Sequence, residues 1–181
     1  TLQGDDIFLD SLPEKYKSLC IERINDLQSS VSRFISHSVF YADFMSEYFA
    51  IERDRIAITP LGIETDDFTS MEKGKGKGGQ TIGYFARLAP EKGLAILVDA
   101  CIKIKMRNLV PDAKLMIGGW LGPTNEEYAN EQFDKLKDAG LDEDYQYVGS
   151  IDRDSKIEFL SSLDVLSVPT TYEEPKGLFV L

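Results

Sequence analysis

The chain has 181 residues, of which 43% are hydrophobic and 28% are charged, as in a globular protein with one good core or one domain plus part of another. The formal net charge of −11 at pH 7 argues against a protein that binds nucleic acid. No apolar run approaches the roughly 20 residues that span a bilayer. Cys20 and Cys101 lack metal-site spacing and a CxxC partner, which is typical of core thiols in a reducing compartment, so we expect a cytoplasmic location.

The first 68 residues predict helices that alternate with short strands. Apolar residues recur at helical spacing over roughly 12–28, and a strand pattern follows at 31–36. Ser38 is a candidate N-cap for the next helix, and a strand at 55–59 ends before Pro60. Because the chain starts at Thr1 in what resembles the tail of a strand, we expect it to be a segment of a longer enzyme.

Residues 69–80 are rich in glycine and lysine and hold almost no apolar side chains, which is the composition of a flexible linker. A phosphate-binding loop at 74–79 is less favoured, because the segment lacks the Gly-Lys-Ser/Thr ending and no strand precedes it. We therefore predict a domain boundary: 1–68 belong to one domain, 69–80 form a linker, and 81–181 form most of a second domain.

After the linker, strands and helices alternate regularly. The pattern predicts strands at 81–86, 114–118, 145–148 and 164–168, and helices at 93–106, from a Thr124 cap to about Ala139, and from an Asp154 cap to about Leu163. This alternation predicts an α/β fold with a parallel sheet covered on both faces. Ligands of such sheets bind beyond the carboxyl ends of the strands, which is where the sequence places Arg87, Gly118–Gly119, Gly149 and the segment 169–177.

Two cations, Arg87 and Lys92, occupy the turn between the strand at 81–86 and the helix at 93–106. The free backbone N–H groups and the dipole of a helix N-terminus attract anions to such a turn. Lys92 is unfavourable beside a helix N-terminus until an anion binds, which favours a functional role over two ordinary surface cations. The sequence therefore predicts a site for a phosphate or diphosphate.

Two glycine-containing loops leave alternatives open. Glu173 and Glu174 precede Gly177 and could accept hydrogen bonds from sugar or ribose hydroxyls, or they could form the acidic first turn of a helix. Gly118–Gly119 follows a strand but lacks the G-x-G-x-x-G spacing of a dinucleotide site, which favours an ordinary loop.

Other polar residues have structural interpretations that we prefer. Asp142–Asp144 and Asp152–Asp154 fit Asp-x-Asp metal patterns, but loop carboxylates and a helix cap are the simpler explanation. The single histidine, His37, could be catalytic, yet the sequence fixes no partner for it, so we expect a structural role.

The motifs occur in the order found in one known family. The segments 82–88 and 91–93 resemble the G-R-L-x-x-x-K-G motif of retaining family 4 (group 1) glycosyltransferases of the GT-B fold. Segments 147–150, 163–170 and 173–178 are similar to later motifs of that family, and 58–64 with Phe68 to its approach to the second domain. The resemblance covers essentially the whole chain. It implies a Rossmann-like donor domain at 81–181 and the C-terminal part of a Rossmann-like, acceptor-side domain at 1–68.

The resemblance also implies roles for individual residues. Arg87 and Lys92 would hold the diphosphate of the donor, and Glu174 would be the first acid of a Glu-x7-Glu motif near the transferred sugar. Substrate-binding positions would be Gly119, Val148, Gly149, Ile151, Lys176, Gly177 and Leu178. We expect no cofactor and no metal, because fixed cations and helix N–H groups can stabilise the leaving nucleoside diphosphate.

The chain departs from the family pattern at several positions. The second acid of the motif would follow Leu181 directly, so we expect the chain alone to be inactive. Lys176 replaces a common Phe, Leu61 stands where Asn is usual, and Gln3 occupies a position where many relatives carry a His.

Together these features predict a retaining hexosyltransferase that uses a UDP- or GDP-sugar and a glycan or lipid-linked acceptor. The part outside the sequence could contact a membrane peripherally, and no nucleic acid is expected as a partner. The alternatives are a non-catalytic nucleotide-sugar-binding module and a nicotinamide dehydrogenase, although the latter lacks its glycine fingerprint.

Overall fold

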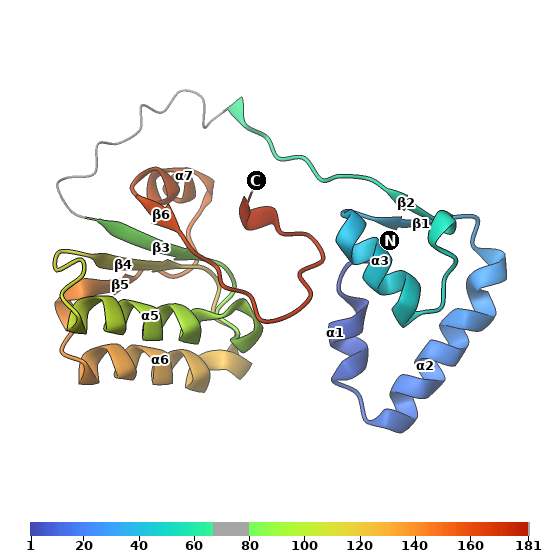
Figure 1. The fold of residues 1–181 in the computed structure, drawn as a ribbon, viewed down its shortest axis with the longest axis horizontal. Coiled ribbons are helices and arrows are strands. Elements are labelled where there is room, and N and C mark those ends of the chain that lie inside the picture. Colours follow the sequence, from blue (N-terminus) through green and yellow to red (C-terminus); the bar gives the residue numbers. More distant parts are fainter. Residues whose placement is uncertain (67–79, 181) are drawn as a thin grey trace. The chain divides into compact units, whose positions relative to one another are not determined.

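A computed structural model describes residues 1–66 and 80–180, which divide into two compact units (Figure 1). Thr1–Ile63 and Glu173–Leu181 group as the first unit, and Glu64–Tyr172 form the second. Phe68 and the predicted linker, apart from Gln80, lie outside the described residues, so the domain boundaries remain predictions. In the part of the chain that the structure describes, the helices are too short or too polar to cross a membrane.

The first unit is built on a pair of parallel strands, β1 (Phe34–Ser36) and β2 (Ile56–Ile58). Helices α1 (Asp5–Asp10), α2 (Glu14–Leu27) and α3 (Val39–Tyr48) accompany them. The buried core consists of Leu2, Leu9, Tyr41, Ala42, Met45, Phe49, Ile51 and Ile56. The predicted helix at 12–28 and both strands are therefore present, whereas α1 was not predicted.

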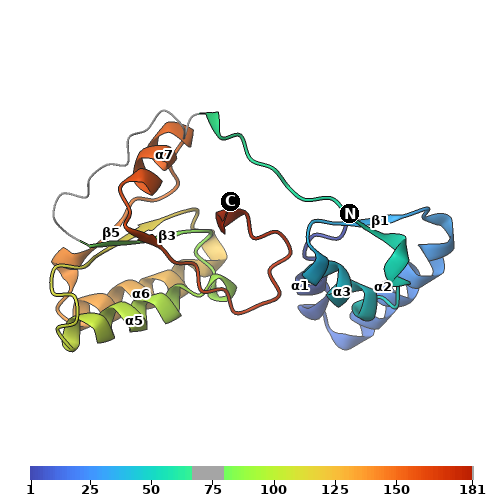
Figure 2. The same cartoon turned by 45° about the horizontal axis from the view of Figure 1, so that its top comes forward.

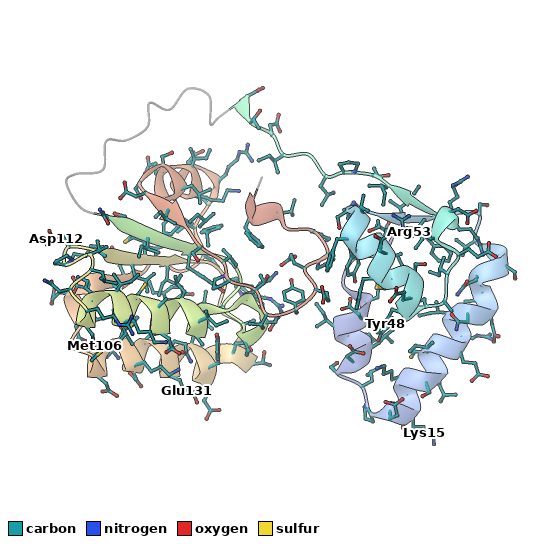
Figure 3. The ribbon with its side chains drawn as sticks, in the orientation of Figure 1. Lys15, Tyr48, Arg53, Met106, Asp112 and Glu131 are labelled. Carbon is teal, nitrogen blue, oxygen red and sulfur yellow. The ribbon has the colours of Figure 1, made fainter. Side chains whose placement is uncertain are left out.

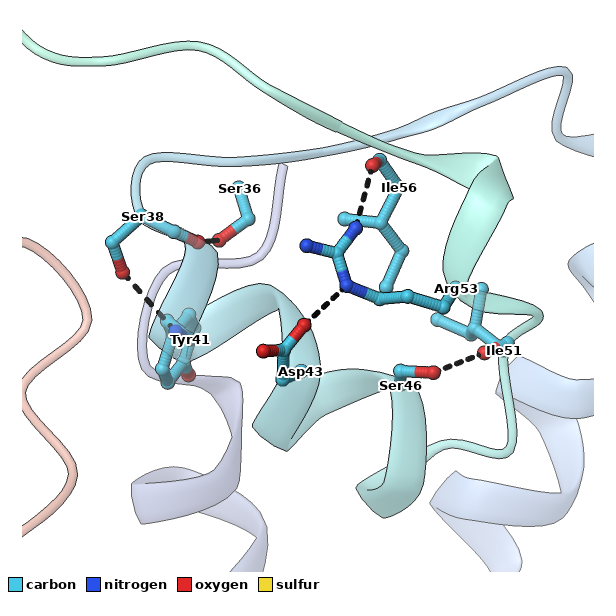
Figure 4. A network of polar contacts seen from close by, with 8 residues as sticks. All are labelled: Ser36, Ser38, Tyr41, Asp43, Ser46, Ile51, Arg53 and Ile56. Atoms are coloured by element: carbon cyan, nitrogen blue, oxygen red, sulfur yellow. Dashed lines mark hydrogen bonds and ion pairs between the residues drawn. The ribbon is translucent and has the colours of Figure 1, made fainter.

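Helix α3 is tied to its surroundings by side-chain hydrogen bonds, which Figure 4 shows from close by. It begins as predicted after Ser38, whose Oγ accepts the N–H of Tyr41 at 3.1 Å. On a later turn, Asp43 pairs with Arg53, which also donates to the carbonyl of Ile56 at 3.2 Å. The helix is thereby anchored to the start of β2.

The second unit contains a four-stranded parallel sheet in the order β5-β4-β3-β6. The strands are β3 (Thr81–Phe85), β4 (Lys114–Gly118), β5 (Tyr145–Tyr147) and β6 (Val165–Leu166). Helices α5 (Leu94–Met106) and α6 (Glu126–Asp138) cover one face, and α7 (Arg153–Ser161) covers the other (Figures 1 and 2). The predicted α/β fold with a parallel sheet covered on both faces is confirmed.

Side chains of β3 alternate between the two faces, as a strand requires. Tyr84 is fully buried in the core on the side of α5 and α6. On the opposite face, the Phe85 ring lies 5.5 Å from the ring of Phe159 in α7, centroid to centroid. A Cβ at Gly83 would lie 2.0 Å from a methyl group of Leu163, so a larger residue there would require that side chain to move. These contacts fix β3, and with it the loop that follows.

Two predicted helix caps in the second unit are wrong. Helix α7 is capped by Asp152, whose Oδ1 accepts the N–H of Ser155 at 2.8 Å, rather than by Asp154. Helix α6 begins at Glu126 after a 3-10 turn at Pro123–Asn125, without the side-chain cap that we expected from Thr124. In α7 the cap lies two residues before the predicted one, and in α6 the chain enters the helix directly from the 3-10 turn.

Candidate functional site

The loops that follow β3, β4 and β5 are joined by hydrogen bonds at the carboxyl edge of the sheet. The N–H of Leu88 donates to the carbonyl of Trp120 at 2.9 Å. Gly119 donates its N–H to the carbonyl of Gly149 at 2.9 Å, and its own carbonyl accepts the hydroxyl of Tyr147 at 3.0 Å. These bonds hold three of the predicted site loops in one layer.

Two glycines allow the loops to approach each other closely. Gly119 has a φ of 133°, and a Cβ at this position would lie 1.8 Å from the carbonyl oxygen of Ala86. Gly93 has a φ of 77°, and its Cβ would lie 1.8 Å from the carbonyl oxygen of Pro169, which follows β6. Side chains are excluded at both places by space and by backbone conformation. The loop after β3 is therefore packed between the loops after β4 and β6.

Arg87 lies directly after β3, and its backbone is better fixed than its guanidinium. The hydroxyl of Tyr84 donates to the carbonyl of Arg87 at 3.1 Å, and burial raises the pKa of that tyrosine. The guanidinium is 46% exposed and pairs with the carboxylate of Glu91. The core thus fixes the start of the side chain, while the charge is at the surface within reach of an anion.

Lys92 belongs to the next turn, the 3-10 segment Pro90–Lys92. Its ammonium donates to the hydroxyl of Tyr172 and lies 4.7 Å from the centre of the tyrosine ring. Tyr172 comes from the segment after β6, eighty residues along the chain. The lysine is therefore held across two loops of the same edge.

The start of α5 contributes less to an anion site than the sequence suggested. The N–H of Ala95 donates to the hydroxyl of Tyr128 in α6 at 3.1 Å. The N–H groups of Ile96 and Leu97 donate to the carbonyl of Gly93. The N–H groups of Ala95 and Ile96, which the sequence suggested for an anion, are therefore used within the fold. The side chains of Arg87 and Lys92 supply the formal positive charge at this turn.

The loop after β5 carries three more of the predicted residues. The N–H of Val148 donates to the carbonyl of Ile117 at 2.9 Å, which continues the pairing with β4 beyond the end of β5. Gly149 then bonds to Gly119, and the half-buried Ile151 precedes the cap of α7. The structure thus brings these three residues to the same edge as Gly119 and Arg87.

The remaining predicted residues lie in the segment that groups with the first unit. The carboxylate of Glu174 accepts the N–H of Gly177 at 3.4 Å, and Leu178 begins a 3-10 turn, Leu178–Val180. Lys176 between them is exposed. A joint site of these four residues with Arg87 and Lys92 stays a prediction.

His37 connects three segments of the first unit. Its Nδ1 lies 3.0 Å from the carbonyl oxygen of Thr59, and its Nε2 lies 3.3 Å from the amide nitrogen of Gln3. Because a carbonyl only accepts, Nδ1 carries the proton and Nε2 accepts from the amide. The sequence offered no signal for the contact with Gln3.

Both Asp-x-Asp motifs have protein partners. Asp144 lies 2.8 Å from the ammonium of Lys105 and 2.7 Å from that of Lys114, and these two hydrogen-bonded cations lower the pKa of its carboxyl. Hydrogen bonds from Ser155 lower the pKa of Asp152, the cap of α7. Asp144 and Asp152 are thus each bound by groups of the chain itself.

The comparisons with known proteins agree with this architecture. The family model for glycosyl transferases group 1 matches residues 66–181, and no curated protein sequence matches the chain. Among solved structures, Anabaena HepE in complex with UDP and glucose is 18% identical, with a TM-score of 0.71 over 88% of this chain and 44% of that one.

Two further solved structures resemble the chain to a similar degree. A glycosyltransferase from Rickettsia africae is 19% identical, with a TM-score of 0.70 over 90% of this chain and 43% of its own. Sucrose-phosphate synthase from Thermosynechococcus elongatus is 17% identical, with a TM-score of 0.70 over 99% and 45%. The chain therefore spans less than half the length of these three proteins and shares their GT-B-type fold. With the family model matching well over half of its residues, the chain belongs to the group 1 glycosyltransferases.

Proposed function

We propose that this chain holds the nucleotide-sugar donor of a retaining, metal-independent hexosyltransferase. The donor is a UDP- or GDP-sugar, and the acceptor is a glycan or a lipid-linked sugar. The observation that carries the proposal is the placement of Arg87 and Lys92 at the carboxyl edge of the sheet, in a chain of this family. The crystal structures of the similar protein HepE in complex with UDP and with UDP-glucose support the choice of donor class.

The proposed chemistry follows from the charges that develop during transfer. When the bond between sugar and phosphate breaks, negative charge builds on the nucleoside diphosphate and positive charge builds at the anomeric carbon. Arg87 presents a planar fork of donors that suits phosphate oxygens, and Lys92 adds a second cation on the neighbouring turn. Donors fixed before the reaction stabilise the leaving group more effectively than mobile ones.

The other candidate residues have proposed roles around the donor. Glu174 acts beside the transferred sugar, and the backbone at Gly177 and Leu178 approaches the sugar phosphate, with Lys176 as an additional cation. The loop residues Gly119, Val148, Gly149 and Ile151 lie toward the base. This assignment is supported by the common edge of the second-unit residues and by the internal hydrogen bond of Glu174.

Location in the cytoplasm is part of the same proposal. It is supported by the two cysteines, both of which are free thiols, because disulfides are rare in reducing compartments. Burial raises the pKa of the Cys101 thiol to about 11, so that this residue is an unreactive part of the core.

A thermal-shift panel with UDP, GDP, ADP and NAD tests the donor class. A ligand that binds only the folded state at about 100 times its Kd adds roughly 2.7 kcal/mol of stability. Because each kcal/mol shifts the Tm of a chain of this size by about 2–4 °C, that corresponds to a rise in Tm of roughly 5–11 °C. We expect this rise with UDP or GDP and none with NAD. A rise with NAD alone, or no rise with any nucleoside diphosphate in a chain that melts cooperatively, contradicts the proposal.

A further inference from the structure

The contact between Lys92 and Tyr172 joins two turns that the fold has already fixed against each other. The N–H of Thr171 donates to the carbonyl of Glu91 at 2.9 Å. Pro169, two residues before Thr171, is also close to the turn: its carbonyl oxygen would lie only 1.8 Å from a Cβ at Gly93. The residues before Lys92 and Tyr172 are thus hydrogen-bonded to each other. The backbone therefore determines where the tyrosine ring meets the lysine.

Tyr172 presents two different features to the ammonium of Lys92. Its hydroxyl oxygen accepts a hydrogen bond from Nζ, and its ring lies 4.7 Å away from Nζ, within the range of a cation–π contact. The hydroxyl acceptor orients the ammonium through this hydrogen bond. Arg87 pairs with the carboxylate of Glu91, which competes with any anion for the guanidinium.

We propose that Tyr172 is a positioning residue that holds Lys92 in the orientation needed for the diphosphate of the donor. The inference rests on the proposed function of this edge. A lysine has a flexible four-carbon stem, and much of its rotamer freedom is lost when it binds an anion. A side chain that is already restrained loses less on binding, which strengthens the complex. An ammonium has three donors, so the bond to Tyr172 is compatible with donation to phosphate oxygens.

The test is a double-mutant cycle on the full chain, with Kd measured by calorimetry for UDP and GDP. Tyr172→Phe keeps the ring and removes the hydroxyl, and we expect about fivefold weaker binding of the preferred diphosphate. Lys92→Ala should weaken binding by roughly 10- to 100-fold. In the double variant, Tyr172→Phe should add less than about 1.5-fold to the effect of Lys92→Ala, because it acts only through the lysine.

A matched control is Tyr145→Phe, at the start of β5, where the ring stacks on Phe133. It should leave the Kd within about 1.5-fold. A fivefold effect of Tyr172→Phe that persists in the Lys92→Ala background would show that the tyrosine acts independently of the lysine, and overturn the inference. An unchanged Kd in Tyr172→Phe overturns it as well. If the wild-type chain binds neither diphosphate, the proposed function fails, and the inference falls with it.

Discussion

A pair of cations at each edge of the second unit's sheet can be compared, and the two pairs have different partners. At the amino edge, Lys105 and Lys114 converge on one carboxylate, Asp144, from the end of α5 and the start of β4. Figure 3 marks this edge by Met106, the last residue of α5, and by Asp112, just before β4. The two ammonium groups and the carboxylate form a compact ion-pair cluster that joins the helix to two strands.

At the carboxyl edge, the cations are held separately. Arg87 pairs with Glu91 four residues later, and Lys92 contacts the hydroxyl and ring of Tyr172. The backbone around them is closely packed at Gly93 and Gly119, whereas the amino edge is held by ion-paired side chains. The comparison teaches that counting cations does not identify a binding edge. What distinguishes the carboxyl edge is the rigid glycine backbone that holds the two cations in place.

The rigidity of the carboxyl edge can be broken most directly at Gly119. Gly119→Ala should lower the free energy of unfolding by about 2–5 kcal/mol, since a left-handed backbone and a clash with Ala86 act together. Gly140→Ala is the matched control: it has a φ of 72°, but a Cβ there meets nothing within 4 Å. It should therefore lower stability by only about 1–2 kcal/mol. Urea unfolding measures both, and equal losses would contradict the role of close packing.

Removing the guanidinium of Arg87 should have the next largest effect. In the full-length enzyme, Arg87→Ala should slow transfer, because it removes about 2–4 kcal/mol of transition-state stabilisation, as for other fixed donors. Arg107→Ala, an exposed arginine directly after α5, is the control and should leave transfer unchanged. Steady-state rates with the preferred donor provide the measurement. Near-wild-type turnover of Arg87→Ala would refute the assignment.

A substitution at the amino edge should change the stability of the fold and leave donor binding unchanged. Asp144→Asn should lower the free energy of unfolding at pH 7 by about 1 kcal/mol, a typical value for exposed ion pairs. Because the two lysines lower the pKa of Asp144 below its ordinary 3.8, its stabilising effect is complete above that value. It is lost as the pH falls through the lowered pKa.

The control for this variant is Asp112→Asn, an exposed aspartate two residues before Lys114. Carboxyl groups titrate within a pH range of roughly 2 to 7. Unfolding curves across this range compare the stability of wild type, Asp144→Asn and Asp112→Asn. Wild type and Asp144→Asn should converge in acid, and the Kd for UDP or GDP should be equal in both at pH 7. A higher Kd in Asp144→Asn would show that the amino edge affects donor binding, and would contradict this prediction.

The regular elements of this chain were largely predictable because their signals are local. Strand β4 has the predicted bounds, 114–118, and α5 begins one residue after the predicted start. Apolar periodicity decides such elements over many residues, and single errors average out. The predicted caps failed because α7 is capped by Asp152 instead of Asp154, and α6 follows a 3-10 turn without any side-chain cap from Thr124.

The composition of the edge was predictable only in part. Topology rules place Arg87, Lys92, Gly119 and Gly149 at the carboxyl ends of the strands, and the structure brings them there. The partners of these residues were not predictable. Tyr172 is eighty residues from Lys92, and Tyr128 reaches the start of α5 from another helix. Such contacts depend on how loops and helices pack, which periodicity does not encode.

A crystal structure of the chain grown with UDP or GDP tests the central claim most directly. The account predicts phosphate oxygens within hydrogen-bond distance of the guanidinium of Arg87 and the ammonium of Lys92, with Tyr172 still in contact with the lysine. A nucleotide whose phosphates lie at the amino edge, beside Lys105 and Lys114, would contradict it.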